Sequence, residues 1–215
     1  MNFDEKIKEG LRLIKADDYP RALQVLGEAY IMQPHDKELL NCIAFLWQRV
    51  SDGNYDLIPE TAEQFILRGN AGLDKKEYDA AYNDYSNAIK IDAKCDFAYY
   101  CRGFLLAYQG RHKEAHKEYS IATKLNPNRG AYWDSAAVSF EAIGDVYQAH
   151  LCHESAVKKS PDDARLWYNY AVFFVDYLKD IDSALEKLNK ALEIFPQYED
   201  ALVNRDYLLS VKNKK

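Results

Sequence analysis

Histidine and cysteine side chains stand at spacings that would suit a metal site on a helix. His112 and His116 are four residues apart, which places them on one helix face, and His150 and His153 flank Cys152. His116 and His150 are 34 residues apart and could approach each other if the chain repeats with that period. No H-E-x-x-H pair and no companion set of acidic or thiolate ligands accompanies them, so we expect half-buried or exposed helix histidines and no metal.

The sequence contains no convincing catalytic arrangement. We find no glycine-rich phosphate loop, no G-x-S-x-G turn and no Cys/His pair with a supporting acid. Carboxylates are numerous, but pairs such as Asp162 and Asp163 stand at an expected helix start, where the helix dipole favours negative charge. We therefore assign no catalytic residue, expect no cofactor and predict that the protein is not an enzyme.

The charge balance argues against nucleic acid as a partner. Lys and Arg total 28 and Asp and Glu total 34, a net charge of −6, and the only basic run is the C-terminal Lys212, Lys214 and Lys215.

The N-terminus lacks signal-peptide features, and no run of about 18 apolar residues predicts a membrane span. The four cysteines are scattered without a C-x-x-C pair and are typical of small buried residues. We expect a soluble, cytoplasmic protein.

Small residues recur at a period of 34, which predicts stacked helical units. The first ladder consists of Gly10, Ala44, Gly69, Gly103, Ala137 and Ala171. Two alanine ladders follow the same register and consist of Ala22, Ala81, Ala115 and Ala149, and of Ala29, Ala88, Ala122 and Ala156. A spacing of 25 in the first ladder and of 59 in the others places a loss of nine residues near 37–61. Gly or Ala at such positions lets two helix backbones approach closely, so a larger side chain would overpack them.

These units resemble the tetratricopeptide repeat family. The matching residues are Tyr99, Gly103, Leu106, Gly110, Ala115, Tyr119, Ala122 and Pro127 in 96–129, and Trp133, Ala137, Phe140, Gly144, Ala149, Ala156 and Pro161 in 130–163. Residues 3–36, 62–95 and 164–198 fit the same register, the last with one inserted residue near Leu178. The resemblance implies an all-α fold, a right-handed superhelical solenoid of antiparallel helix hairpins. It would contain about five full repeats, one truncated repeat and a C-terminal capping helix.

The register also predicts how the chain is organised. Residues 1–50 would form an N-terminal hairpin plus one further helix from about 37 to 50, and 51–58 a break or hinge, because the sequence Ser-Asp-Gly-Asn at 51–54 interrupts the helix. Pro59 and Glu60 suit the first turn of the next helix, and 59–198 would be the repeat array. Residues 199–215 would be a capping helix with a basic tail.

In this family the first helices of the hairpins line a concave groove, and the resemblance implies which residues face it. The predicted groove residues are Ile66, Asn70, Phe97, Tyr100, Cys101, Phe104, Tyr108, Asp134, Val138, Tyr168 and Asn169, with Leu73, Ser135 and Val172 beside them. The stretch 97–108 is unusually aromatic, as a peptide-binding site requires. The alternative is that these aromatic residues only pack against the neighbouring helix.

The resemblance yields two main functional hypotheses. A third, an enzyme built on this scaffold, is disfavoured because the sequence contains no reactive constellation. The first is a protein-interaction scaffold or adaptor that holds a peptide or protein segment in this groove. The second is a structural subunit that self-associates or joins a larger complex, so a homo-oligomer stays open. Some family members bind chaperone tails through a clamp of Lys, Asn and Arg; the corresponding positions here include Cys101, Asp134 and Val138, and we predict no such binding.

Overall fold

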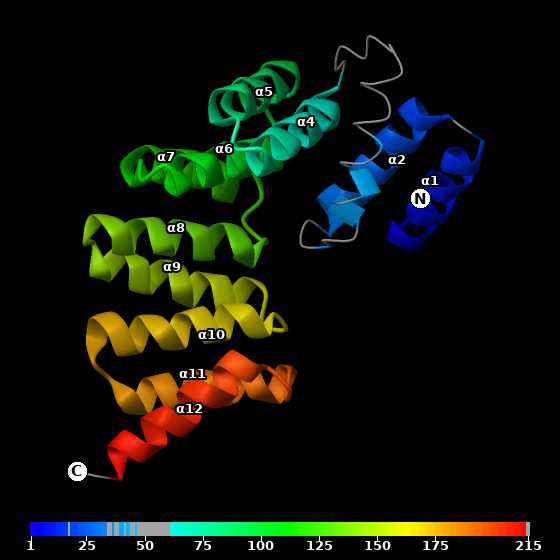
Figure 1. The fold of residues 1–215 in the computed structure, drawn as a ribbon. Coiled ribbons are helices and arrows are strands. Elements are labelled where there is room, and N and C mark those ends of the chain that lie inside the picture. The colour runs from blue at the N-terminus through cyan, green and yellow to red at the C-terminus, as the bar shows by residue number, and fades with distance from the viewer. Residues whose placement is uncertain are drawn as a thin grey trace. The chain divides into compact units, whose positions relative to one another are not determined.

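The computed structural model describes residues 1–16, 18–33, 36, 39–40, 42–43, 46 and 61–213. This part of the chain contains helices and no strand, which confirms the all-α prediction. Its elements are α1 (Phe3–Lys15), α2 (Tyr19–Met32), α4 (Ala62–Asp74), α5 (Tyr78–Ile91), α6 (Asp96–Tyr108), α7 (His112–Leu125), α8 (Gly130–Ile143), α9 (Val146–Lys159), α10 (Ala164–Phe173), the π-helix η1 (Phe174–Leu178), α11 (Ile181–Ile194) and α12 (Glu199–Lys212) (Figure 1).

The helices follow one another as hairpins. In each of the first four described pairs the second helix begins 16 residues after the first, as α4 begins at 62 and α5 at 78. The short connectors between them force neighbouring helices to run antiparallel, and α1 packs on α2, α4 on α5, α8 on α9 and α10 on α11. The repeat period in the sequence is therefore the period of the hairpins.

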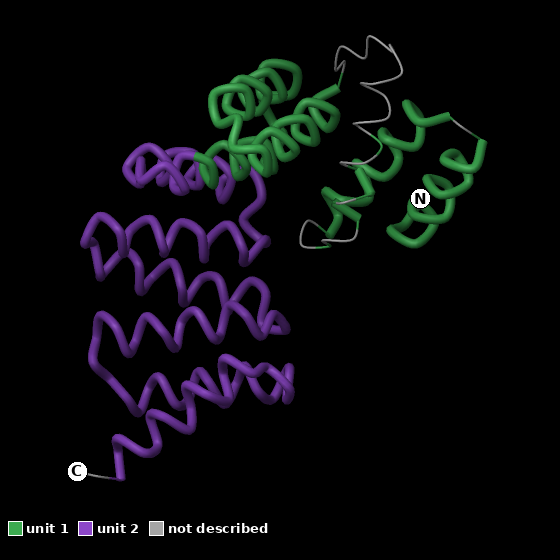
Figure 2. Tube along the Cα trace, viewed as in Figure 1, with its two compact units in different colours: residues 1–105 green, residues 106–215 purple. Residues whose placement is uncertain are grey.

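The chain divides into two compact units, residues 1–105 and 106–215 (Figure 2). Within the first unit α2 also packs against α4, and within the second unit α7 to α12 pack in chain order. The expected break at 51–58 and the helical turn at Pro59 and Glu60 lie outside the described residues. So does most of the expected helix over 37–50, of which Leu39, Leu40, Cys42, Ile43 and Leu46 are described and helical.

Local sequence explains where the helices begin. Asn2 and Glu5 form a capping box at α1, with both side-chain to backbone hydrogen bonds at 2.9 Å, and Thr61 and Gln64 form another at α4. Aspartates cap later helices, as Asp180 does at α11 by accepting a hydrogen bond from the Ser183 N–H at 3.0 Å. These caps satisfy amide groups that have no partner within the helix.

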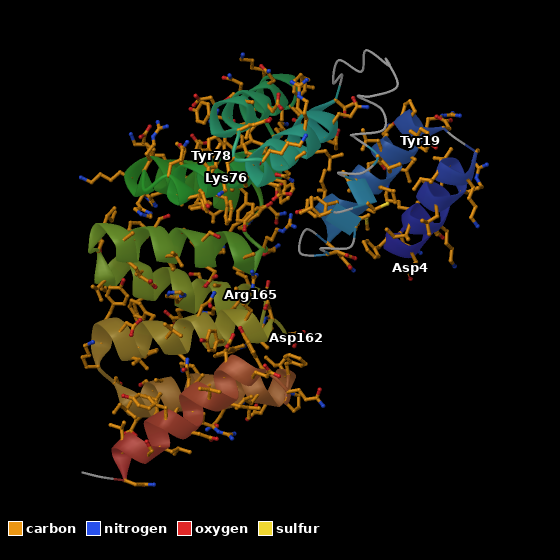
Figure 3. The ribbon with its side chains drawn as sticks, in the orientation of Figure 1. Asp4, Tyr19, Lys76, Tyr78, Asp162 and Arg165 are labelled. Carbon is orange, nitrogen blue, oxygen red and sulfur yellow. The ribbon has the colours of Figure 1, made fainter. Side chains whose placement is uncertain are left out.

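Four of the connectors inside the hairpins pass through a left-handed backbone conformation. Gly110 and Gly144 adopt φ values of +77° and +82°, while Lys76 and Lys179 occupy the equivalent connectors with φ values of +63° and +55°. Lys76 lies between α4 and α5, two residues before Tyr78 (Figure 3). A residue with a Cβ pays about 1–2 kcal/mol for this conformation, so the lysines are strained where glycine would not be.

The inserted residue in 164–198 is absorbed by the π-helix. Helix α11 begins 17 residues after α10, one more than in the other pairs. At η1 the hydrogen bonds close over five residues instead of four, so one extra residue fits into the helix without a separate loop. The sequence located the insertion, but the π-helix itself was not expected.

The ladder residue Gly69 shows how tightly the helices approach. A Cβ at this position would lie 2.6 Å from Cε1 of Tyr85, a fully buried ring whose hydroxyl donates a 2.7 Å hydrogen bond to Oδ1 of Asn70. Gly72, one turn along the same helix, has its nearest neighbour at 3.6 Å, an ordinary van der Waals contact.

We predict opposite effects of alanine at these two glycines. Gly69→Ala should lower the free energy of unfolding by about 1–3 kcal/mol, because the buried ring of Tyr85 must move. Gly72→Ala should leave it unchanged or raise it by about 0.5–1 kcal/mol, because alanine has the better helix propensity. Urea unfolding followed by circular dichroism measures both, and equal effects at the two positions would contradict the close approach at Gly69.

Candidate functional site

A cavity of about 230 Å³ opens in the first unit. Its walls come from α2, α4, α5 and α6, together with Leu40. The lining residues, which we call the aromatic pocket, are Tyr30, Leu40, Asn70, Leu73, Asp74, Tyr85, Phe97, Tyr100, Cys101 and Phe104. Complete small-molecule sites measure about 300–1,000 Å³, so this volume suits a side chain of a larger partner better than a free ligand.

Helix α6 supplies the aromatic wall. Phe97, Tyr100 and Phe104 follow the three- and four-residue spacing that places side chains on one helix face. Phe97 stacks on Tyr100 with centroids 5.8 Å apart and rings inclined by 17°, and Tyr30 meets Phe97 edge-on at 6.4 Å. Phe104 is 45% exposed. One end of this wall is therefore held by ring contacts and the other end faces solvent.

The floor of the pocket is polar but internally satisfied. Asn70 accepts the hydrogen bond from Tyr85, which ties α4 to α5 beneath the cavity. Burial, with a smaller contribution from the charge of Asp74, raises the pKa of both Tyr30 and Tyr85, so their phenols stay neutral. Asp74 is the one charged side chain among the described lining residues, and it is exposed at the rim.

The structure brings together part of the predicted groove set. Asn70, Phe97, Tyr100, Cys101 and Phe104 all line the aromatic pocket, as does Leu73. Ile66 does not, because its side chain is fully buried and offers no surface to a ligand. Ile66 is therefore part of the core, although the family register implied that it faces the groove.

Other lining residues were missed from the sequence. Tyr30 and Tyr85 belong to the second helices of their hairpins, whereas the family register implies a groove lined by the first helices. Asp74 could have been found, because it follows Asn70 by four residues and therefore shares its helix face.

The remaining predicted residues lie in the second unit, where a further cavity of about 290 Å³ opens. Its lining, which we call the C-terminal pocket, comprises Tyr168, Ala171, Val172, Val175, Asp176, Leu188, Asn204, Tyr207 and Leu208. Nδ2 of Asn204 donates a 3.1 Å hydrogen bond to the hydroxyl of Tyr168. Of the other predicted residues, Tyr108 and Val138 are exposed and Asn169 is half-buried, and none of them lines this pocket.

Asp134 belongs to an internal polar network, although the register placed it in the groove. It is 6% exposed, and its Oδ1 lies 3.3 Å from Nδ1 of His153 while its Oδ2 accepts a 2.8 Å hydrogen bond from Asn169. Nε2 of His153 is 2.6 Å from Oε1 of Glu141, and the imidazole stacks on Tyr170 at 5.5 Å. The network joins α8, α9 and α10, so Asp134 and Asn169 hold neighbouring hairpins together.

The other histidines considered as possible metal ligands pack against aromatic rings. His116 lies 4.1 Å from the ring centroid of Phe140, and Nδ1 of His150 is 3.1 Å from the hydroxyl of Tyr170. Like His112, both are half-buried on their helices. Among the residues that the structure describes, no three His, Cys, Asp or Glu side chains gather in a way that could hold a metal ion.

Comparison with known proteins matches these features to one family. Residues 96–129 match a family model described as the tetratricopeptide repeat, and residues 135–199 match a second model with the same description. A heat shock protein sti1 homolog of Schizosaccharomyces pombe is 27% identical over 105 residues, which is 49% of this chain and 18% of that protein. The chain thus spans less than a fifth of that relative's length.

Solved structures share the fold over nearly the whole chain. TTC0263, a thermophilic TPR protein of Thermus thermophilus, superimposes with a TM-score of 0.63 at 15% identity, covering 96% of this chain and 98% of its own. YrrB, described as a TPR protein with an unusual peptide-binding site, gives a TM-score of 0.58 at 19% identity with the same coverage. Within the described residues, no helix has the length and apolar character that crossing a membrane would require.

The network around His153 makes the stability of the second unit depend on pH. Burial alone would lower the pKa of His153, but its hydrogen bond with Glu141 and the negative charges of Asp134 and Glu141 outweigh burial and raise it. A histidine whose pKa is raised by folding stabilises the fold fully below its unfolded pKa. This stabilisation is lost as the pH rises through the folded value.

We therefore expect the difference in unfolding free energy between wild type and His153→Gln to be largest near about pH 5.5 and to shrink towards about pH 9. Urea unfolding at a series of pH values measures this difference. His112→Gln, which replaces a half-buried histidine on α7 outside this network, serves as the control. A His153→Gln difference that stays constant with pH would mean that folding does not raise the pKa of His153, and a difference that grows with pH would mean that folding lowers it.

Proposed function

Because this chain is a tetratricopeptide repeat protein, we propose that it is an interaction scaffold that binds a peptide or protein segment in the aromatic pocket. The observation that carries this proposal is the wall of Phe97, Tyr100 and Phe104, which borders a cavity open to solvent. Aromatic side chains contribute large apolar contact areas for little loss of conformational entropy, and anchor residues of interfaces are often bound in such pockets.

The arrangement of the pocket further supports binding. The Phe97 and Tyr100 rings are already stacked and the Tyr85 hydroxyl is already bound to Asn70, so a partner would not have to order these groups. Preorganisation of this kind increases affinity because fewer side chains lose freedom on binding. The peptide-binding site named for YrrB agrees with this use of the fold, although at 19% identity the likeness concerns the fold alone.

The electrostatics of the pocket bear on the partner's charge. A clamp for a chaperone tail requires basic side chains, whereas the described residues that line the aromatic pocket include no Lys or Arg and carry the carboxylate of Asp74. A terminal carboxylate would be repelled there. The charge of the pocket therefore favours an internal segment of a partner over a chain terminus.

A separate observation supports the second hypothesis, self-association. Phe104 and Tyr108 on α6 are large apolar residues with exposed side chains. A stable oligomer of the purified protein in light scattering would favour a structural subunit. A monomer would favour the adaptor.

We predict that Tyr100→Ala with Phe104→Ala abolishes partner binding, because two anchors of about 2 kcal/mol each are removed. The measurement is affinity capture from native lysate with quantitative mass spectrometry, comparing wild type with the double variant. Far-UV circular dichroism should show unchanged helicity.

The matched control is Tyr147→Ala with Leu151→Ala, which removes an exposed aromatic and an exposed aliphatic residue four positions apart on α9. Proteins captured by wild type and by this control, but lost from the pocket variant, are the expected partners. An identical set for all three proteins would exclude the aromatic pocket as the binding site.

A further inference from the structure

Helix α12 is in register with the first helices of the hairpins. It begins 35 residues after α10, the same interval that separates Tyr168 from Val203 and Val172 from Tyr207. Tyr168, Val172 and Tyr207 line the C-terminal pocket together, which shows that the two helices contribute equivalent positions to one surface. Helix α12 therefore extends this surface as well as covering the last hairpin.

The exposed surface of α12 carries two large apolar side chains among its polar ones, where a purely capping helix would be polar throughout. Val203 is 68% exposed and Tyr207 is 64% exposed, and their four-residue spacing places them on the same helix face. Terminal repeats of solenoids need a polar outer face to remain soluble. These two side chains thus form an apolar surface beside a cavity with an apolar floor of Val172, Val175 and Leu188.

Negative charge borders this surface without a compensating cation. Asp176 lines the pocket, and Asp200 lies in the first turn of α12. Burial, followed by the charges of Asp200 and Asp176, raises the pKa of Tyr168 against the opposing effect of its hydrogen bond from Asn204. No Lys or Arg is among the lining residues, and over the described ranges neither aspartate takes part in an ion pair.

We propose that the C-terminal pocket is a second binding site, which takes a peptide segment carrying a large apolar side chain next to a lysine or arginine. The apolar side chain would enter the cavity against Val172 and Tyr207. The neighbouring cation would meet Asp176 at the rim, where a pair between opposite charges across an interface gives specificity. This site lies in the second unit and does not depend on the aromatic pocket.

The test uses the full chain and a library of random twelve-residue peptides displayed on phage. Wild type serves as bait, and peptides that also bind a Val203→Ser, Tyr207→Ala variant are removed. Both side chains are mostly exposed, so this variant should fold, and its thermal unfolding checks that it does. Enriched peptides should pair a bulky apolar residue with an adjacent Lys or Arg. Failure to enrich any peptide, or enrichment of acidic or uncharged ones, would overturn the proposal.

The strongest enriched peptide then serves as a labelled probe in fluorescence anisotropy. Its affinity should fall about tenfold or more for Val203→Ser with Tyr207→Ala, and severalfold for Asp176→Asn at low salt, with a smaller difference from wild type at high salt because salt screens the charge pair. Tyr147→Ala, an equally exposed tyrosine on α9, should leave it unchanged. An affinity insensitive to Asp176→Asn would reject the role of charge.

Two further outcomes separate this site from the alternatives. The double variant of the aromatic pocket, Tyr100→Ala with Phe104→Ala, should bind the probe like wild type; loss of binding there would place the peptide in the first unit instead. If light scattering shows an oligomer that the α12 variant converts to a monomer, the surface is an interface between copies of this chain and the peptide proposal fails.

Discussion

The close approach of paired helices is the constraint on which the rest of this protein depends. Every residue of the two alanine ladders, from Ala22 and Ala29 to Ala149 and Ala156, is fully buried. Large side chains of the facing helix occupy the space that these small residues leave, as the ring of Tyr85 does beside Gly69. Because the small residues recur in the same helical phase, each hairpin presents its first helix in the same way, and side chains 34 positions apart reach the same surface.

The same packing determines which polar residues remain available to a partner. Asp134 is an acidic residue at a position that the family register places in the groove. Its carboxylate instead contacts His153 and Asn169, because a buried charge between hairpins needs a partner. Asp74 and Asp176 lie on less enclosed parts of their helices and stay at the rims of the two pockets. Burial between repeats therefore turns one acidic side chain into a structural element and leaves others for recognition.

The extra residue in the last hairpin shows how local and repeated constraints combine. A loop of variable length would shift α11 along α10 and move Leu188 away from its place in the core. The π-helix at η1 instead absorbs the residue within the turn, so Ala184, Leu188 and Ala191 remain buried. The register found in the sequence is thus maintained by a helix whose hydrogen bonding is irregular.

The sequence by itself determined the helical class, the hairpin period, the site of the insertion and the aromatic character of α6, because spacing and residue type are properties of the chain alone. Only the tertiary structure decided that Ile66 is buried, that Tyr30 and Tyr85 complete the aromatic pocket and that Val203 and Tyr207 face solvent. Register predicts which way a side chain leaves its helix. Its exposure depends on the length of the side chains that meet it from other helices, and these are brought together only when the chain folds.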